Sequence, residues 1–213
     1  TTNEETNFEG ACGLDASLIS ARTILNLDSE VENAICVGSA GGFEQHFRLP
    51  STCIELDSSN YINYSVKIKD LKGGHSGIDI DAGKTNAIFA MLRLLLTIRC
   101  GSNDLPGCLF HLVKFNGGTS SNAIPRECSV TIACCDPRIE ERLRASFETL
   151  RNDISIVEDT VQMEVRIDQE TNSSSVLCAS STNKILNFLS ALPNGVIRKV
   201  GNDVESSLNL GIA

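Results

Sequence analysis

Apolar and polar residues alternate most regularly over residues 61–69. Apolar side chains occupy every second position there, and polar or basic side chains occupy the positions between them. A period of two is typical of a strand that buries one face and exposes the other. The predicted buried face consists of Ile62, Tyr64, Val66 and Ile68. Similar runs predict further strands over 108–115, 128–135 and 161–167.

Apolar residues at helical spacing predict three helices among and after these strands. The first covers 82–100 and follows a glycine-rich loop at 72–77. The second starts at Asp136-Pro137, because aspartate is favoured at the N-cap and proline at the first helical position. The third covers 182–192. The strands and the first two helices follow the order β-α-β-β-α-β, which is the ferredoxin-like arrangement.

Residues 1–60 carry shorter apolar runs. The runs 22–27 and 34–38 predict two short strands, and the first of them ends at Asp28. In open α/β sheets, ligands bind at the carboxyl ends of the strands, so Asp28 is a candidate binding residue. A turn or capping role, which is common for aspartate at a strand end, is the alternative interpretation.

Composition narrows the function classes. The 213 residues include 18 Lys and Arg against 27 Asp and Glu, a formal charge of −9, which argues against a surface that binds nucleic acid. No apolar run approaches the roughly 20 residues that span a membrane, and we expect no membrane partner. The nine cysteines form no Cys-x-x-Cys pair, so reduced thiols in the cytoplasm are expected instead of a disulfide framework or a structural zinc site.

Two further features could carry chemistry. Glu4 and Glu5 are adjacent, and neighbouring side chains point to opposite sides of an extended backbone. One carboxylate could therefore bind a metal while the other faces the reacting water, although two solvated acids are the simpler interpretation. His75 lies among glycines, which indicates backbone that folds tightly or approaches a ligand closely. An ordinary loop histidine is the alternative there.

Five groups of residues occur in an order that resembles a known family. They are Thr2-Asn-Glu-Glu5 with Phe8-Glu-Gly-Ala11, Asn26-Leu-Asp-Ser-Glu30 with Gly38-Ser-Ala-Gly-Gly42, Leu71-Lys-Gly-Gly-His-Ser-Gly77, Asn116-Gly-Gly-Thr119 with Asn122-Ala-Ile-Pro-Arg-Glu127, and Ala191-Leu-Pro-Asn-Gly-Val196. Together they resemble the Xaa-His dipeptidases, also called aminoacyl-histidine or cytosol nonspecific dipeptidases. These enzymes belong to the zinc aminoacylase/carboxypeptidase superfamily of metallopeptidases.

The resemblance implies a hydrolase that uses two Zn²⁺ ions to cleave dipeptides. Glu4 matches the general base that takes a proton from the water between the metals, Glu5 matches a ligand of one zinc, and Asp28 matches a ligand of the other. His75 matches a histidine of the lid domain that helps to bind the oxyanion. Asn122 matches a position of the lid domain that contacts the substrate.

The resemblance also implies a fold class and a domain organisation. Residues 1–57 would be the C-terminal part of the first segment of an α/β zinc-peptidase catalytic domain. Residues 58–172 would form an α+β ferredoxin-like lid unit, and residues 173–213 a linking helix and the start of a second, incomplete lid unit. The family is commonly dimeric through the lid, so a homodimer is expected. His75 could serve its own chain or its neighbour.

Several residues that the family uses have no counterpart in this sequence. The histidines are His46, His75 and His111, and none of them belongs to the family's His-x-Asp motif or matches its last histidine ligand. Asn3 replaces the aspartate that usually precedes the Glu pair. We expect the chain to be the middle of a longer dipeptidase. The alternative is a catalytically incompetent fragment that acts as a lid, dimerisation or binding module.

Overall fold

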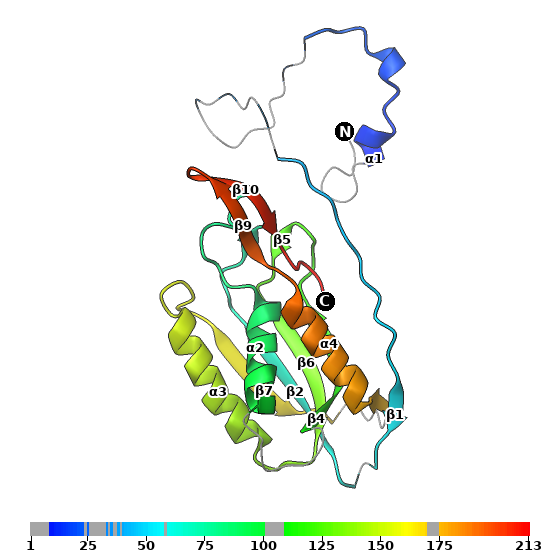
Figure 1. Ribbon diagram of the computed structural model, residues 1–213, viewed down its shortest axis with the longest axis vertical. Coiled ribbons are helices and arrows are strands. Elements are labelled where there is room, and N and C mark those ends of the chain that lie inside the picture. Colours follow the sequence, from blue (N-terminus) through cyan, green and yellow to red (C-terminus); the bar gives the residue numbers. More distant parts are fainter. Residues whose placement is uncertain are drawn as a thin grey trace. The chain divides into compact units, whose positions relative to one another are not determined.

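The computed structural model describes residues 9–23, 25, 33, 35, 38, 40–57, 59–100, 109–169 and 175–213 (Figure 1). The chain divides into two compact units, residues 1–42 and 43–213. In the first unit, helix α1 covers Glu9–Cys12 and a 3-10 turn covers Ala16–Leu18. The strands predicted at 22–27 and 34–38 fall largely outside the described residues, so they stay predictions.

The second unit is built on a four-stranded antiparallel sheet. Its strands are β2 (Ile62–Lys69), β4 (Phe110–Gly117), β6 (Cys128–Cys134) and β7 (Gln162–Ile167), in the order β4-β6-β2-β7. Helix α2 (Ala87–Cys100) joins β2 to β4, and helix α3 (Ile139–Ile154) joins β6 to β7. This connectivity confirms the predicted ferredoxin-like arrangement.

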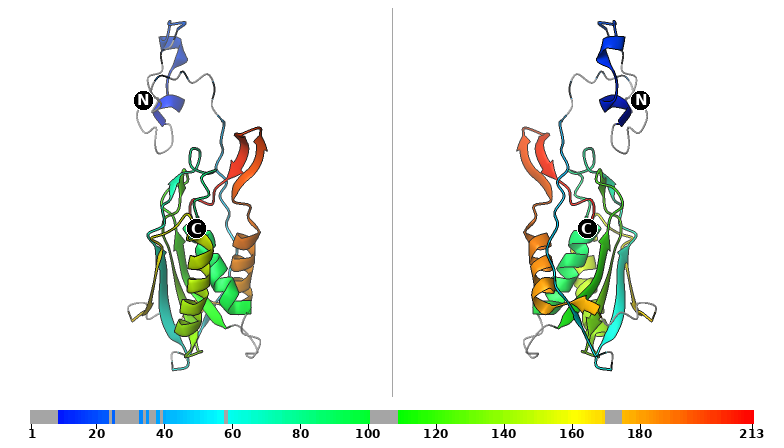
Figure 2. Two further views of the ribbon diagram at one scale, coloured as in Figure 1. Left: turned by 90° about the vertical axis from the view of Figure 1, so that its left-hand side faces the viewer. Right: turned by 90° about the vertical axis from the view of Figure 1, so that its right-hand side faces the viewer.

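The helices cover one face of this sheet. Figures 1 and 2 show α2, α3 and a further helix, α4 (Ala179–Ala191), packed side by side on that face. Tyr64, Val66 and Ile68 of β2 point into the resulting core, as the alternation predicts. Ile62, which shares their face, is 45 % exposed at the start of the strand. The core is therefore a single layer between the sheet and the helices.

Three pairs of short strands accompany the main sheet. Strand β1 (Cys53–Glu55) pairs with β8 (Ser175–Leu177), β3 (Gly74–His75) with β5 (Ala123–Ile124), and β9 (Gly195–Val200) with β10 (Asp203–Leu208). Every pair is antiparallel. The loop predicted at 72–77 therefore contains a strand, whose partner lies almost fifty residues further along the chain.

The helix boundaries differ from the prediction in one informative way. Helix α2 begins at Ala87, five residues after the predicted start. Asn86 caps it, because the Asn86 Oδ1 accepts a hydrogen bond from the Ile88 N–H at 2.9 Å. The residues before Asn86 belong instead to the loop that carries His75. Within the part of the chain that the structure describes, no helix has both the length and the apolar composition to cross a membrane.

Candidate functional site

The β3–β5 ladder brings His75 and Asn122 together. His75 lies opposite Ala123 in this ladder, and the Ser76 N–H donates to the Asn122 carbonyl oxygen at 2.8 Å. The two lid residues that the resemblance singles out are thus backbone neighbours, although they are far apart in sequence. This pair is the candidate functional site of the described residues.

The hydrogen bonds of the His75 ring fix its tautomer. The His75 Nδ1 accepts from the Gly77 N–H at 3.1 Å and from the Ile78 N–H at 3.3 Å. Because both partners are donors, Nδ1 carries no proton, and the neutral ring carries its proton on Nε2. The side chain is exposed. His75 can therefore offer one N–H, from Nε2, to a bound group.

Asp79 holds the backbone around His75. The Asp79 Oδ2 accepts from the His75 N–H at 2.9 Å, and its Oδ1 lies 2.9 Å from the Lys84 Nζ. The hydrogen bond from Lys84, followed by the one from the His75 backbone, lowers the pKa of the Asp79 carboxyl. A Cβ on Gly74 would overlap the Asp79 carboxylate and approach the Lys84 Nζ to 2.7 Å. The glycine beside His75 is needed for this tight fold.

Glu158 closes the loop that carries His75. Its Oε2 accepts from the Lys72 N–H at 2.8 Å, and its Oε1 accepts from the Thr85 N–H at 2.9 Å. Glu158 is only 1 % exposed, although it is a carboxylate. A buried carboxylate is stable where it is hydrogen-bonded, and here both oxygens are satisfied by backbone donors. One side chain thus ties the two ends of the 72–85 loop to each other.

The Asn122 side chain is oriented by its own loop. The Ser120 Oγ donates to the Asn122 Oδ1. Among the described residues, no hydrogen bond involves the Asn122 Nδ2. Its two N–H groups are thus available on the same ladder as the His75 Nε2, and both groups are donors. A pair of neutral donors suits a ligand that presents carbonyl or carboxylate oxygens.

The structure does not test the other predicted site residues. Glu4, Glu5 and Asp28 lie outside the described residues, so their roles stay predictions. Among the residues that the structure does describe, no group of three or more His, Cys, Asp or Glu side chains could hold a metal ion. His46 is exposed beside Glu44, and His111 is buried with its Nδ1 donating to the Leu177 carbonyl oxygen at 2.9 Å.

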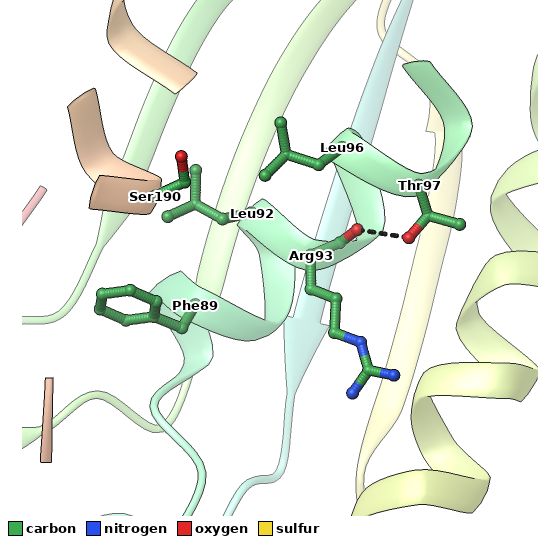
Figure 3. Close-up of a pocket in the computed structure, with 6 residues that line it drawn as sticks. All are labelled: Phe89, Leu92, Arg93, Leu96, Thr97 and Ser190. Atoms are coloured by element: carbon green, nitrogen blue, oxygen red, sulfur yellow. Dashed lines mark hydrogen bonds between the residues drawn. The ribbon is translucent and has the colours of Figure 1, made fainter. Parts of the chain in front are cut away.

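A hollow elsewhere on the second unit lacks the side chains of a candidate active site. It has a volume of about 490 Å³ and lies between α2 and α4 (Figure 3). Its lining consists of Phe89, Leu92, Arg93, Leu96, Thr97 and Ser190. The only charged member, Arg93, forms an ion pair with Asp153 of α3. The lining offers the hydroxyl groups of Thr97 and Ser190 but no histidine or carboxylate that could activate them, so the hollow is not a candidate active site.

Glu158 and Asn209 hold the site's backbone but were not singled out from the sequence. Asn209 donates to the Ala123 carbonyl oxygen at 2.7 Å. Both side chains bind backbone groups of distant segments. Neither lies in a spacing pattern that indicates such a role, and the motif resemblance does not include them.

Comparison with known proteins finds related peptidases. Residues 66–159 match the family model of the peptidase dimerisation domain of M20 type. The cytosol non-specific dipeptidase of Escherichia coli (strain K12) is 34 % identical over 220 residues, which cover 100 % of this chain and 43 % of that protein. This chain thus spans less than half the length of that relative.

A solved structure is similar over most of the chain. The aminoacylhistidine dipeptidase from Vibrio alginolyticus matches with a TM-score of 0.66 and 29 % identity, over 77 % of this chain and 33 % of that one. The motif resemblance drawn from the sequence is therefore confirmed. The whole chain is thus similar to dipeptidases of this kind, and residues 66–159 match the M20 peptidase dimerisation domain.

Proposed function

We propose that this chain is part of a cytoplasmic metallopeptidase that hydrolyses dipeptides, including those of the Xaa-His type. The observation that carries the proposal is the exposed His75 ring, which lies on a loop that four separate hydrogen bonds hold in place and whose backbone neighbours Asn122. The names of the two relatives support the substrate class, and the name of the first supports the cytoplasm.

The proposed roles follow from the donors at the site. The His75 Nε2–H would donate to the carbonyl oxygen of the scissile peptide as that oxygen gains negative charge, which stabilises the transition state more than the ground state. The Asn122 amide would orient the dipeptide. Glu4 would take a proton from the attacking water and return it to the leaving amine. Two zinc ions, with Glu5 and Asp28 among their ligands, would supply Lewis acidity.

Metal content and hydrolysis test this proposal together. We expect about two zinc atoms per chain by mass spectrometry of the purified longer protein that contains this segment, and measurable hydrolysis of an Xaa-His dipeptide. Glu4→Gln should lower kcat by at least about 10²-fold while zinc stays bound, because only the proton transfer is removed. Glu9→Gln changes a nearby acid and should leave kcat unchanged. If that longer protein binds no metal at micromolar zinc and cleaves no dipeptide, the proposal fails.

We also propose that two copies pair through the free edge of the main sheet, which is β7. The opposite edge strand, β4, is partly occupied, because the Leu112 N–H donates to the Thr182 Oγ1 at 3.2 Å and Gly117 pairs with Ala213. Immediately after β7, the Asp168 N–H donates to the Asn63 carbonyl oxygen of β2 at 2.8 Å. By alternation, the N–H groups of residues 163, 165 and 167 face outward. No described segment pairs with them.

A proline at Val165 should therefore prevent dimerisation without unfolding the sheet. Proline removes only the outward N–H at this position, and edge strands tolerate it. We expect the wild-type chain to sediment as a dimer in analytical ultracentrifugation, Val165→Pro as a monomer with an unchanged circular dichroism spectrum, and Val165→Ala as a dimer. A wild-type monomer, or a Val165→Pro dimer, would show that β7 is not the interface.

A further inference from the structure

The last five residues lie across the loop that carries Asn122. The Gly117 N–H donates to the Ala213 carbonyl oxygen at 2.8 Å, and the Ala213 N–H donates back at 3.0 Å. Two residues earlier, the backbone of Gly211 passes so close to the loop that a Cβ added to Gly211 would approach the Ser120 carbonyl oxygen to 2.8 Å. We call residues 209–213 the strap.

Asn209, at the start of the strap, holds the backbone on both sides of Asn122. Its Nδ2 donates to the Ala123 carbonyl oxygen at 2.7 Å and to the Ser121 carbonyl oxygen at 3.3 Å. The carbonyl oxygen between them, on Asn122 itself, accepts from the Ser76 N–H at 2.8 Å. Three consecutive carbonyl groups are therefore fixed, two by the strap and one by the residue next to His75.

A buried asparagine anchors the strap to the core. Asn86 is 3 % exposed, and its Nδ2 donates to the Leu210 carbonyl oxygen at 2.9 Å, while its Oδ1 caps α2. The Leu210 N–H donates to the Asn194 Oδ1 at 3.1 Å. Both backbone groups of Leu210 are thus held by side chains from before α2 and after α4. The position of Asn209 is set by helices that pack on the main sheet.

We propose that Asn209 is a positioning residue, which fixes the backbone on both sides of Asn122, and with it the Asn122 side chain, through the carbonyl groups of Ser121 and Ala123. Asn209 acts through the backbone and does not contact the substrate. The inference rests on the proposed function only where it assumes that Asn122 and His75 bind a dipeptide. The strap itself, and its hold on the loop, can be tested without any activity.

Asn209→Asp separates this role from a general effect on folding. The substitution keeps the size of the side chain, removes both N–H donors and places a carboxylate oxygen against two carbonyl oxygens. We expect the amide hydrogen exchange of residues 120–124 and 76–77 to rise about tenfold or more, while β2 and β6 keep their protection. Asn152→Asp adds the same charge on the exposed surface of α3, and it should leave the exchange of residues 120–124 and 76–77 unchanged. Unchanged exchange at 120–124, or an equal rise in β2 and β6, overturns the proposal.

A second variant disturbs the strap at Gly211 instead of Asn209. Gly211→Ala forces a methyl group against the backbone of Ser120 and Ser121, and it should raise exchange in the same residues. Gly42→Ala, where a Cβ would meet nothing within 4 Å, is the matched control. If residues 120–124 of Gly211→Ala exchange at the wild-type rate, the proposal that the strap holds this loop is also contradicted.

A nuclear magnetic resonance titration with an Xaa-His dipeptide then tests whether Asn209 positions Asn122 for binding. Asn122→Ala and Asn209→Asp should each weaken binding, by about three- to tenfold, and the double variant should bind no more weakly than Asn122→Ala alone. Additive losses would mean that Asn209 acts other than through Asn122. If the wild-type chain binds no dipeptide, the proposed function fails, and the exchange experiments still decide whether the strap holds the loop.

Discussion

Replacing Glu158 with alanine is expected to lower the free energy of unfolding by about 3–5 kcal/mol. The substitution removes both acceptors of the Lys72 and Thr85 N–H groups at once. A hydrogen bond to a charged group contributes about 1.5–3 kcal/mol, and a buried donor that loses its partner keeps its desolvation cost. The 72–85 loop would also lose the link between its two ends.

Urea denaturation followed by circular dichroism measures this effect. Glu158→Gln keeps one carbonyl oxygen and turns an N–H group toward the other donor, so we expect a loss between those of wild type and alanine. Glu148→Ala removes an exposed acid that lies 3.9 Å from Arg151, and it should change stability by less than about 0.5 kcal/mol. A Glu158→Ala protein within about 1 kcal/mol of wild type would mean that water replaces the carboxylate.

The main sheet and its helices could be predicted from the sequence because their signal is local. The apolar positions of β2 recur at every second residue, and Leu143, Phe147 and Leu150 recur along one side of α3. Burying these faces against each other requires no other information. The start of α2 was wrong by five residues, because Asn86 caps the helix while the apolar pattern already begins near Ala82.

The candidate site could be predicted only in part, for a physical reason. His75 was singled out by its glycines and Asn122 by the motif resemblance, but no residue pattern shows that β3 pairs with β5. That ladder is two residues long and is made of backbone hydrogen bonds. Glu158 and Asn209 likewise bind backbone groups, which every residue carries. Side-chain periodicity therefore cannot identify either of them.

Replacing His75 with asparagine is expected to lower kcat for dipeptide hydrolysis by about 10²–10³-fold and to change KM little. The asparagine Oδ1 can take the place of Nδ1 as the acceptor of the Gly77 and Ile78 N–H groups, so the loop should keep its fold. What it lacks is the N–H donor at the position of Nε2. A donor that acts on the developing oxyanion contributes to the transition state and little to substrate binding.

The matched substitutions separate the donor from the loop. His75→Gln can place an N–H group near the position of Nε2 but loses the acceptor for Gly77, so part of the rate should return while the exchange of the 76–78 amides rises. His46→Asn, at an exposed histidine beside Glu44, should leave kcat unchanged. If His75→Asn keeps kcat within about threefold of wild type while the loop is intact, His75 does not stabilise the oxyanion, since one lost donor there costs about 10²-fold or more.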